Sequence, residues 1–124
     1  MAGWLFRDVE LDPGERLVFR RGANLLRGRR KVGGEVSVTD RRLLFLPNQL
    51  EHLVGAGDQS VPLAAVLEVT VVPPRPRPEM LRGLPPVPRA RAEIDTSDGL
   101  LLLSLEDAEA LARVLADVGG PVRG

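Results

Sequence analysis

Residues 33–48, which read GGEVSVTDRRLLFLPN, constrain the fold of this chain more than any other stretch. Val36 and Val38 alternate with polar residues, which is the period-two pattern of a strand with one buried face. A polar turn follows, and then a continuous apolar run at 43–46 that ends at Pro47, a residue that strands tolerate only at their ends or edges. The sequence therefore predicts two antiparallel strands joined as a hairpin.

Further strand patterns occur on both sides of this hairpin. In the first, Leu17 and Phe19 are expected on one face, and in another Leu67, Val69 and Val71 alternate with polar residues. The dipeptide Asp98-Gly99 is a strong signal for a hairpin turn. We predict strands at 15–20, 60–63, 66–72, 89–95 and 100–103, and loops at 21–34 and 49–59.

An amphipathic helix is predicted at 104–118. Ser104 is the candidate N-cap, and two acidic residues follow it, where backbone N–H groups and the helix dipole favour negative charge. Apolar residues then recur at spacings of three and four along one helical face. These residues are Leu105, Ala108, Leu111, Ala112, Leu115 and Val118.

Length and composition indicate one domain, 1–124, with an N-terminal segment at 1–12 and a proline-rich loop at 73–89. Seven prolines between positions 73 and 88 exclude a central strand or a helix there. No apolar run approaches the roughly 20 residues of a membrane span, and the N-terminal apolar run is too short for a signal peptide. We expect a cytoplasmic protein, with peripheral membrane contact left open.

The strand order, ending in one amphipathic helix, is similar to that of pleckstrin-homology-like (PH-like) barrels. Four segments strengthen a resemblance to the bacterial branch of the GRAM family, which has this fold. Val38 and Val66 stand where that family has leucine and isoleucine. The segments are PGERLVFRRGAN at 13–24, GGEVSVTDRRLLFLPN at 33–48, SVPLAAVLEV at 60–69, and the final strand-turn-strand-helix.

The resemblance implies a mainly β fold, a two-sheet barrel of about seven antiparallel strands capped by the C-terminal helix. It also implies a non-catalytic binding role, because the motif residues form the core and the turns of the barrel. In lipid-binding PH domains, basic residues after the first strand bind phosphate groups. The residues in that place here, our candidate anion or lipid site, are Arg20, Arg21, Arg27, Arg29, Arg30 and Lys31.

The charge pattern supports this candidate and also offers an alternative. Residues 16–42 carry nine basic and two acidic groups, a net charge of +7, whereas residues 92–124 carry two basic and seven acidic groups, a net charge of −5. The basic residues either bind an anionic partner or only pair with the acidic C-terminal third. Arg41 and Arg42 are left out, because antiparallel pairing puts them at the opposite end of the strand.

A protein partner is the second functional hypothesis. Arg82, Pro85 and Pro88 fit the polyproline pattern that SH3-type grooves recognise, although a stiff connecting loop explains the same residues. A sheet edge or the groove beside the C-terminal helix are other docking places. Nucleic acid is disfavoured, because no aromatic residues interleave the basic run to stack on bases.

No catalytic or metal-binding constellation is recognisable in the sequence. Cysteine is absent, and His52 is the only histidine, so a zinc site and a nucleophile–histidine pair lack their usual residues. Phosphate-binding and dinucleotide-binding glycine motifs are also absent. We therefore expect neither an enzyme nor a cofactor or metal site.

Overall fold

The computed structural model describes residues 7–73 and 90–119. Its described part contains one antiparallel sheet whose strands lie in the order β4-β3-β2-β1-β7-β6-β5. Two helices and a short 3-10 helix, η2, join or follow these strands. The elements are β1 (Leu17–Arg27), β2 (Arg30–Thr39), β3 (Arg42–Pro47), α1 (Gln49–Leu53), β4 (Gln59–Pro62), η2 (Leu63–Ala65), β5 (Val66–Val72), β6 (Arg91–Thr96), β7 (Gly99–Ser104) and α2 (Ala108–Gly119).

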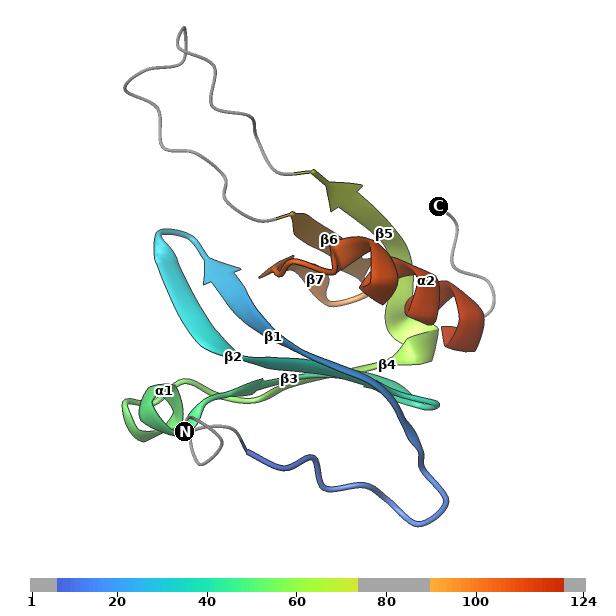
Figure 1. Ribbon diagram of the computed structural model, residues 1–124, viewed down its shortest axis with the longest axis horizontal. Coiled ribbons are helices and arrows are strands. Elements are labelled where there is room, and N and C mark those ends of the chain that lie inside the picture. The colour runs from blue at the N-terminus through green and yellow to red at the C-terminus, as the bar shows by residue number, and fades with distance from the viewer. Residues whose placement is uncertain (1–6, 74–89, 120–124) are drawn as a thin grey trace, which may run out of the picture.

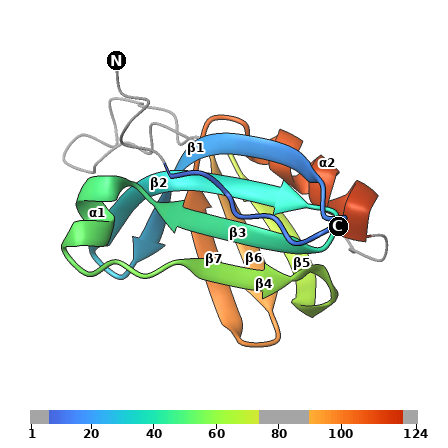
Figure 2. The ribbon, with the colours of Figure 1, turned by 90° about the horizontal axis from the view of Figure 1, so that it is seen from below.

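The sheet folds over on itself at β1. This strand pairs with β2 along almost its whole length, but with β7 only at Asn24–Leu26. Consequently β1–β4 form one layer and β5–β7 form a second, as Figures 1 and 2 show from two directions. The two-sheet barrel with about seven antiparallel strands and a C-terminal helix, expected from the sequence, is therefore confirmed.

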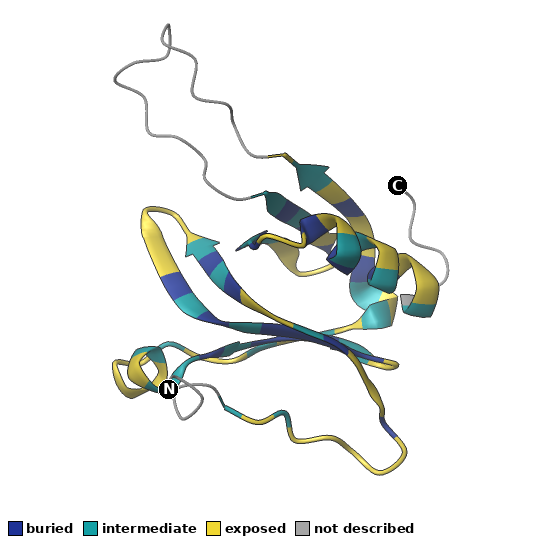
Figure 3. Ribbon diagram, viewed as in Figure 1, coloured by how far each residue is buried: buried dark blue, intermediate teal, exposed yellow. Residues whose placement is uncertain are grey.

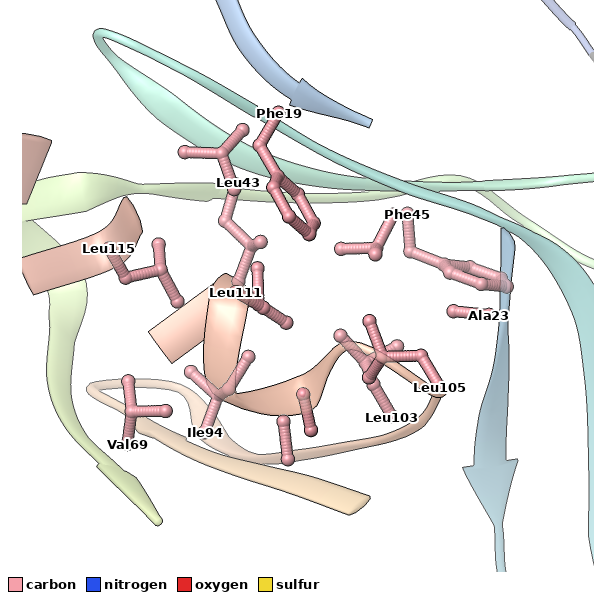
Figure 4. Close-up of a cluster of buried hydrophobic side chains, with 14 of the residues drawn as sticks. Phe19, Ala23, Leu43, Phe45, Val69, Ile94, Leu103, Leu105, Leu111 and Leu115 are labelled. Atoms are coloured by element: carbon pink, nitrogen blue, oxygen red, sulfur yellow. The ribbon is translucent and has the colours of Figure 1, made fainter. Parts of the chain in front are cut away.

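Helix α2 covers the opening between the two layers with its apolar face. Ala108, Leu111 and Leu115 are fully buried, at the spacing expected for one side of a helix. They meet core side chains from both layers, among them Leu43 of β3 and Ile94 of β6 (Figure 4). Burial of this face, rather than intrinsic helix propensity, accounts for the stability of a helix this short.

The hairpin at 33–48 forms as predicted. Val36 pairs with Phe45 and Val38 with Leu43 across β2 and β3, and all four side chains point into the core. Gly34 is required by close backbone packing, because a Cβ atom there would lie 2.2 Å from the carbonyl oxygen of Leu46. Sequence alternation therefore identified the strands and the core positions Val36 and Val38, whereas Ser37 and Thr39, which were expected on an exposed face, are also buried.

The predicted loop at 21–34 is wrong. β1 continues to Arg27, and β2 begins at Arg30, so only Gly28 and Arg29 form the turn. Gly28 has a φ of +59°, a left-handed conformation that glycine adopts readily. Leu25 and Val32 face each other and are buried, which holds these strands in place although their glycines disfavour a strand.

Three further details of the secondary structure differ from the predictions. The helix begins at Ala108, because Ser104 still pairs with Arg91 and Asn24 as the last residue of β7 and so is not an N-cap. The turn of the last hairpin is Ser97–Asp98, since Gly99 already pairs with Thr96. Part of 49–59 is helical, namely α1.

Because of irregular strand pairing, two leucines that were predicted to face the core are exposed, namely Leu67 and Leu17. A shift in register between Val66 and Glu68 leaves Val66 and Val69 buried but Leu67 54% exposed, so Leu67 does not share a face with Val69. A similar irregularity after Leu17 leaves that side chain exposed, while Phe19 is buried. Such bulges add one residue to a strand and therefore invert the alternation locally.

Candidate functional site

The six basic residues of the candidate anion site separate into two groups in the structure. Arg20 donates from Nε to Oε1 of Glu35 at 2.6 Å, and from Nη2 to the carbonyl oxygen of Arg7 at 3.1 Å. Arg21 donates to Oδ2 of Asp107 at 3.1 Å, and its guanidinium lies 5.0 Å from the ring centre of Phe19. These two arginines therefore have structural partners within the domain.

The other four basic residues occupy the tip of the β1–β2 hairpin, and all four are exposed: Arg27, Arg29, Arg30 and Lys31. Across the Gly28–Arg29 turn, Arg27 pairs directly with Arg30, so their side chains project from the same face. Like charges placed directly opposite each other on adjacent strands repel. In the part of the chain that the structure describes, only Arg30 of these four makes an ion pair.

The tip lies far from Arg20 and Arg21. Arg27 lies six positions after Arg21 on the same strand, which corresponds to about 20 Å in extended backbone. One ligand of the size of a phosphate group therefore cannot contact both groups. The candidate site reduces to the hairpin tip, defined here as residues 27–31.

Helix α1 contacts the tip through a side chain, and the sequence analysis did not predict this helix. Arg30 Nη2 donates to Oε1 of Glu51 at 3.4 Å, and the backbone N–H of Gly33 donates to Oε2 of the same carboxylate at 3.2 Å. Asn48 caps the helix by accepting a hydrogen bond from Glu51 N at 2.9 Å. The pair Asn48 and Glu51, three residues apart, is the signal that indicates such a helix start.

The opposite end of the hairpin holds a buried polar cluster rather than a binding surface. Glu15, whose side chain is inaccessible to solvent, accepts from Arg42 Nε at 2.8 Å and from the Thr39 hydroxyl at 2.6 Å. Thr39 Oγ1 in turn accepts the backbone N–H groups of Arg41 and Arg42, both at 3.0 Å. We call Glu15, Thr39 and Arg42 the base cluster.

The hydrogen bonds of the base cluster alter its ionisation. Those from Arg42, Thr39 and the backbone N–H of Asp12, in that order of importance, lower the pKa of Glu15 to about 2. Reciprocally, the bond to Glu15 raises the pKa of Arg42. Glu15, Thr39 and Arg42 belong to segments that carry the GRAM resemblance, so these signature residues have a structural role.

The surface hollows of the described part include two whose lining contains no residue of the hairpin tip. One, of about 470 Å³, is floored by glycines of β1 and β2 and bordered by Asn24, Asn48 and Asp107. The other, of about 730 Å³, lies between residues 7–12 and the outer side of β3 and β4.

The remaining predicted functional residues are placed as follows. Arg82, Pro85 and Pro88 lie outside the described residues, as do the 74–89 part of the proline-rich loop and the first six residues of the N-terminal segment. His52 is exposed on α1. Among the helices of residues 7–73 and 90–119, none has the length and apolar character to cross a membrane.

No protein-family model matches this chain, and no curated protein matches it in sequence. Solved structures do match. The N-terminal PH domain of Vps36 aligns with a TM-score of 0.60 and 15% sequence identity, over 88% of this chain and 85% of that one. The hSac2 domain of the human phosphoinositide phosphatase Sac2 aligns with a TM-score of 0.62 and 8% identity, over 89% and 73%.

A third match contains two kinds of domain. The linker-DH/PH domains of p115-RhoGEF align with a TM-score of 0.58 and 11% identity, over 91% of this chain but 31% of that one. At such low identities the likeness concerns the fold alone. The described chain, with its seven-stranded bent sheet and capping C-terminal helix, has the PH-like fold.

Proposed function

We propose that this protein is a non-catalytic binding module of the GRAM type that recognises anionic, phosphate-bearing groups through its hairpin tip. The observation that carries the proposal is the direct pairing of Arg27 with Arg30 at an exposed turn that also carries Arg29 and Lys31. An anion between the two guanidinium groups would replace their repulsion with two charge-assisted hydrogen bonds. We place the protein in the cytoplasm, where such an anion is either soluble or on a membrane surface.

The contrast with Arg20 and Arg21 supports the assignment. Those two arginines already donate to Glu35 and Asp107, so an incoming anion would compete with an internal carboxylate. At the tip, the competing carboxylate is Glu51, whose contact with Arg30 is long, at 3.4 Å. The fold of Sac2, a phosphoinositide phosphatase, adds support by analogy only.

The test is calorimetric titration with sodium tripolyphosphate at low salt. The double variant Arg27→Gln/Arg30→Gln should bind about tenfold more weakly or worse, because it loses two hydrogen bonds between charged groups. A matched control, Arg16→Gln/Arg113→Gln, removes the same net charge from exposed positions away from the tip. Equal affinities in the two variants would contradict the proposal, since only net charge would then matter.

A protein-docking role is the second candidate. β5 is the last strand in the sheet order and has seven residues, so one of its sides has no neighbouring strand among the described residues. Leu67, 54% exposed, lies on this strand. An extended peptide could add to such an edge through backbone hydrogen bonds. Loss of partner binding on Leu67→Lys, with tripolyphosphate binding unchanged, would favour this second role.

A further inference from the structure

The outer face of β3 is covered, although the core lies on the other side of this strand. The core takes every second residue of β3, so alternation turns Leu44 and Leu46 to the outer face. Leu44 is nevertheless only 5% exposed, and its cross-strand partner Ser37 is only 1% exposed. Another part of the chain therefore shields this face from water.

The cover is the segment at 7–12, which we call the N-terminal strap. Figure 2 shows it crossing β2 and β3 on their outer side. In Figure 3 the strap is exposed or half-buried, whereas the strands that it crosses are largely buried. Arg7 donates twice to the carboxylate of Asp58, and Arg42 donates to the carbonyl oxygen of Glu10 at 2.8 Å. The strap is thus tied to the sheet at two points.

The strap does not fill the space beneath it. The hollow of about 730 Å³ remains between the strap and β3–β4, and its aliphatic lining residues are Val9, Leu11, Leu44 and Leu46. This volume lies within the usual range of binding pockets. The two arginines of the lining already donate to carboxylates, and the acidic residues of the strap are exposed to solvent. The space therefore fits apolar side chains.

The sequence places three large apolar residues directly before the strap. Trp4, Leu5 and Phe6 lie outside the described residues, and they include two of the four aromatic residues of the chain. The other two are buried phenylalanines of the core. Arg7 itself lines the hollow, and three residues of extended chain reach about 10 Å. All three apolar residues are therefore within reach of it.

We propose that this hollow is a docking site for the chain's own residues 4–6, whose apolar side chains pack on Leu44 and Leu46 beneath the strap. Because Arg7 is tied to Asp58, these residues are held next to the hollow at an effective concentration on the order of millimolar. A free apolar peptide must compete with that concentration. Docking does not depend on anion recognition, since no residue of the hairpin tip lines the hollow.

Trp4 is the only tryptophan of the chain, so it reports its own environment. In the full chain its emission should lie to the blue of the emission from a free peptide of residues 1–12. Acrylamide should quench it several-fold less than in the peptide, because a docked indole leaves water. Emission and quenching equal to those of the peptide would overturn the proposal.

A substitution in the floor of the hollow locates the indole. Leu46→Glu places a charge beside the proposed apolar contact, so the emission should shift to the red and quenching should approach that of the peptide. The matched control is Leu67→Glu on β5, which adds the same charge at an exposed position outside the hollow. This control should leave emission and quenching unchanged. Far-UV circular dichroism checks the fold of both variants.

A second variant loosens the strap without changing the floor of the hollow. Asp58→Asn removes the charged partner of Arg7 at a side chain that is 42% exposed. Residues 4–6 are then held less closely, and acrylamide quenching of Trp4 should rise toward that of the peptide. This variant decides the question if Leu46→Glu does not fold.

The other outcomes contradict the proposal in distinct ways. A protected tryptophan that neither variant releases is buried elsewhere on the domain. Protection that is lost on dilution, together with a dimer in analytical ultracentrifugation, means that the segment of a second copy fills the hollow. The tip variant Arg27→Gln/Arg30→Gln should leave Trp4 emission unchanged, and a change would contradict the independence of the two sites. Failure of docking leaves the proposed anion recognition standing.

Discussion

The two ends of the β1–β2 hairpin use arginine in opposite ways. At the base, Arg42 donates both Nε and Nη2 to the inaccessible Glu15 carboxylate and also reaches the carbonyl oxygen of Glu10. At the tip, Arg27 pairs with Arg30, a residue of the same charge, and both side chains are exposed. Arginine is thus part of a network around a buried carboxylate at one end, and it is exposed to solvent at the other.

This difference shows why the number of basic residues is a poor guide to a binding site. A guanidinium whose donors are already matched by internal acceptors offers little to a ligand. A guanidinium held beside a like charge is stabilised when an anion binds between the two charges. We therefore predict that the stability of the fold depends on the base end and that ligand binding depends on the tip. Each of the following experiments could contradict this distinction.

The largest effect on stability is expected from the core at the base end. Leu43 is 1% exposed and pairs with Val38 next to the base cluster. Leu43→Ala should reduce the free energy of unfolding by about 2–5 kcal/mol, since it creates a cavity as well as losing buried area. Leu53→Ala beside the tip should stay within about 0.5 kcal/mol. Urea unfolding measures both, and similar losses would erase the distinction between the two ends.

The next effect concerns the base cluster itself. Thr39→Val keeps the shape of the side chain but leaves the backbone N–H groups of Arg41 and Arg42 without their acceptor, which should cost about 1–3 kcal/mol. Ser37 is the matched control, because its hydroxyl is buried on the same strand but has no hydrogen-bond partner among the described residues. Ser37→Ala should be near neutral. A larger loss for Ser37→Ala than for Thr39→Val would show that the cluster is not stabilising.

Ionisation of Glu15 gives the base end a pH dependence. Its pKa in the fold is about 2, against an ordinary value of 4.5, so folding favours the ionised form. This stabilisation is complete above about pH 4.5 and is lost as the pH falls toward 2. Urea midpoints measured over that interval should fall less steeply for Glu15→Gln than for the wild type. Parallel pH profiles would assign the acid sensitivity to other carboxylates.

The smallest effect on stability is expected at the tip. Arg27→Gln/Arg30→Gln removes a repulsive cross-strand pair, so the free energy of unfolding should stay the same or rise by less than about 1 kcal/mol. The gain should shrink as salt is added, because salt screens exposed charges. Marked destabilisation would mean that the tip arginines have structural partners, and the contrast with Arg42 would then fail.

Local patterns in the sequence were enough for much of the fold. Alternation located the 33–48 hairpin and β5, and the three-four spacing identified the buried face of α2. These signals are readable because a side chain in a strand or helix repeats its environment at a fixed period. The extension of β1 through Arg27 was missed, since glycine and asparagine do not favour strands, and pairing with β2 and β7 holds this segment extended.

Sequence alone therefore determined a PH-like arrangement of strands and helix and named the six basic residues. Tertiary structure decided which of them are free to bind. It joined Arg21 to Asp107, 86 positions away in the chain, and set Arg27 opposite Arg30. Such relations depend on register and on contacts between distant segments, which no local period encodes.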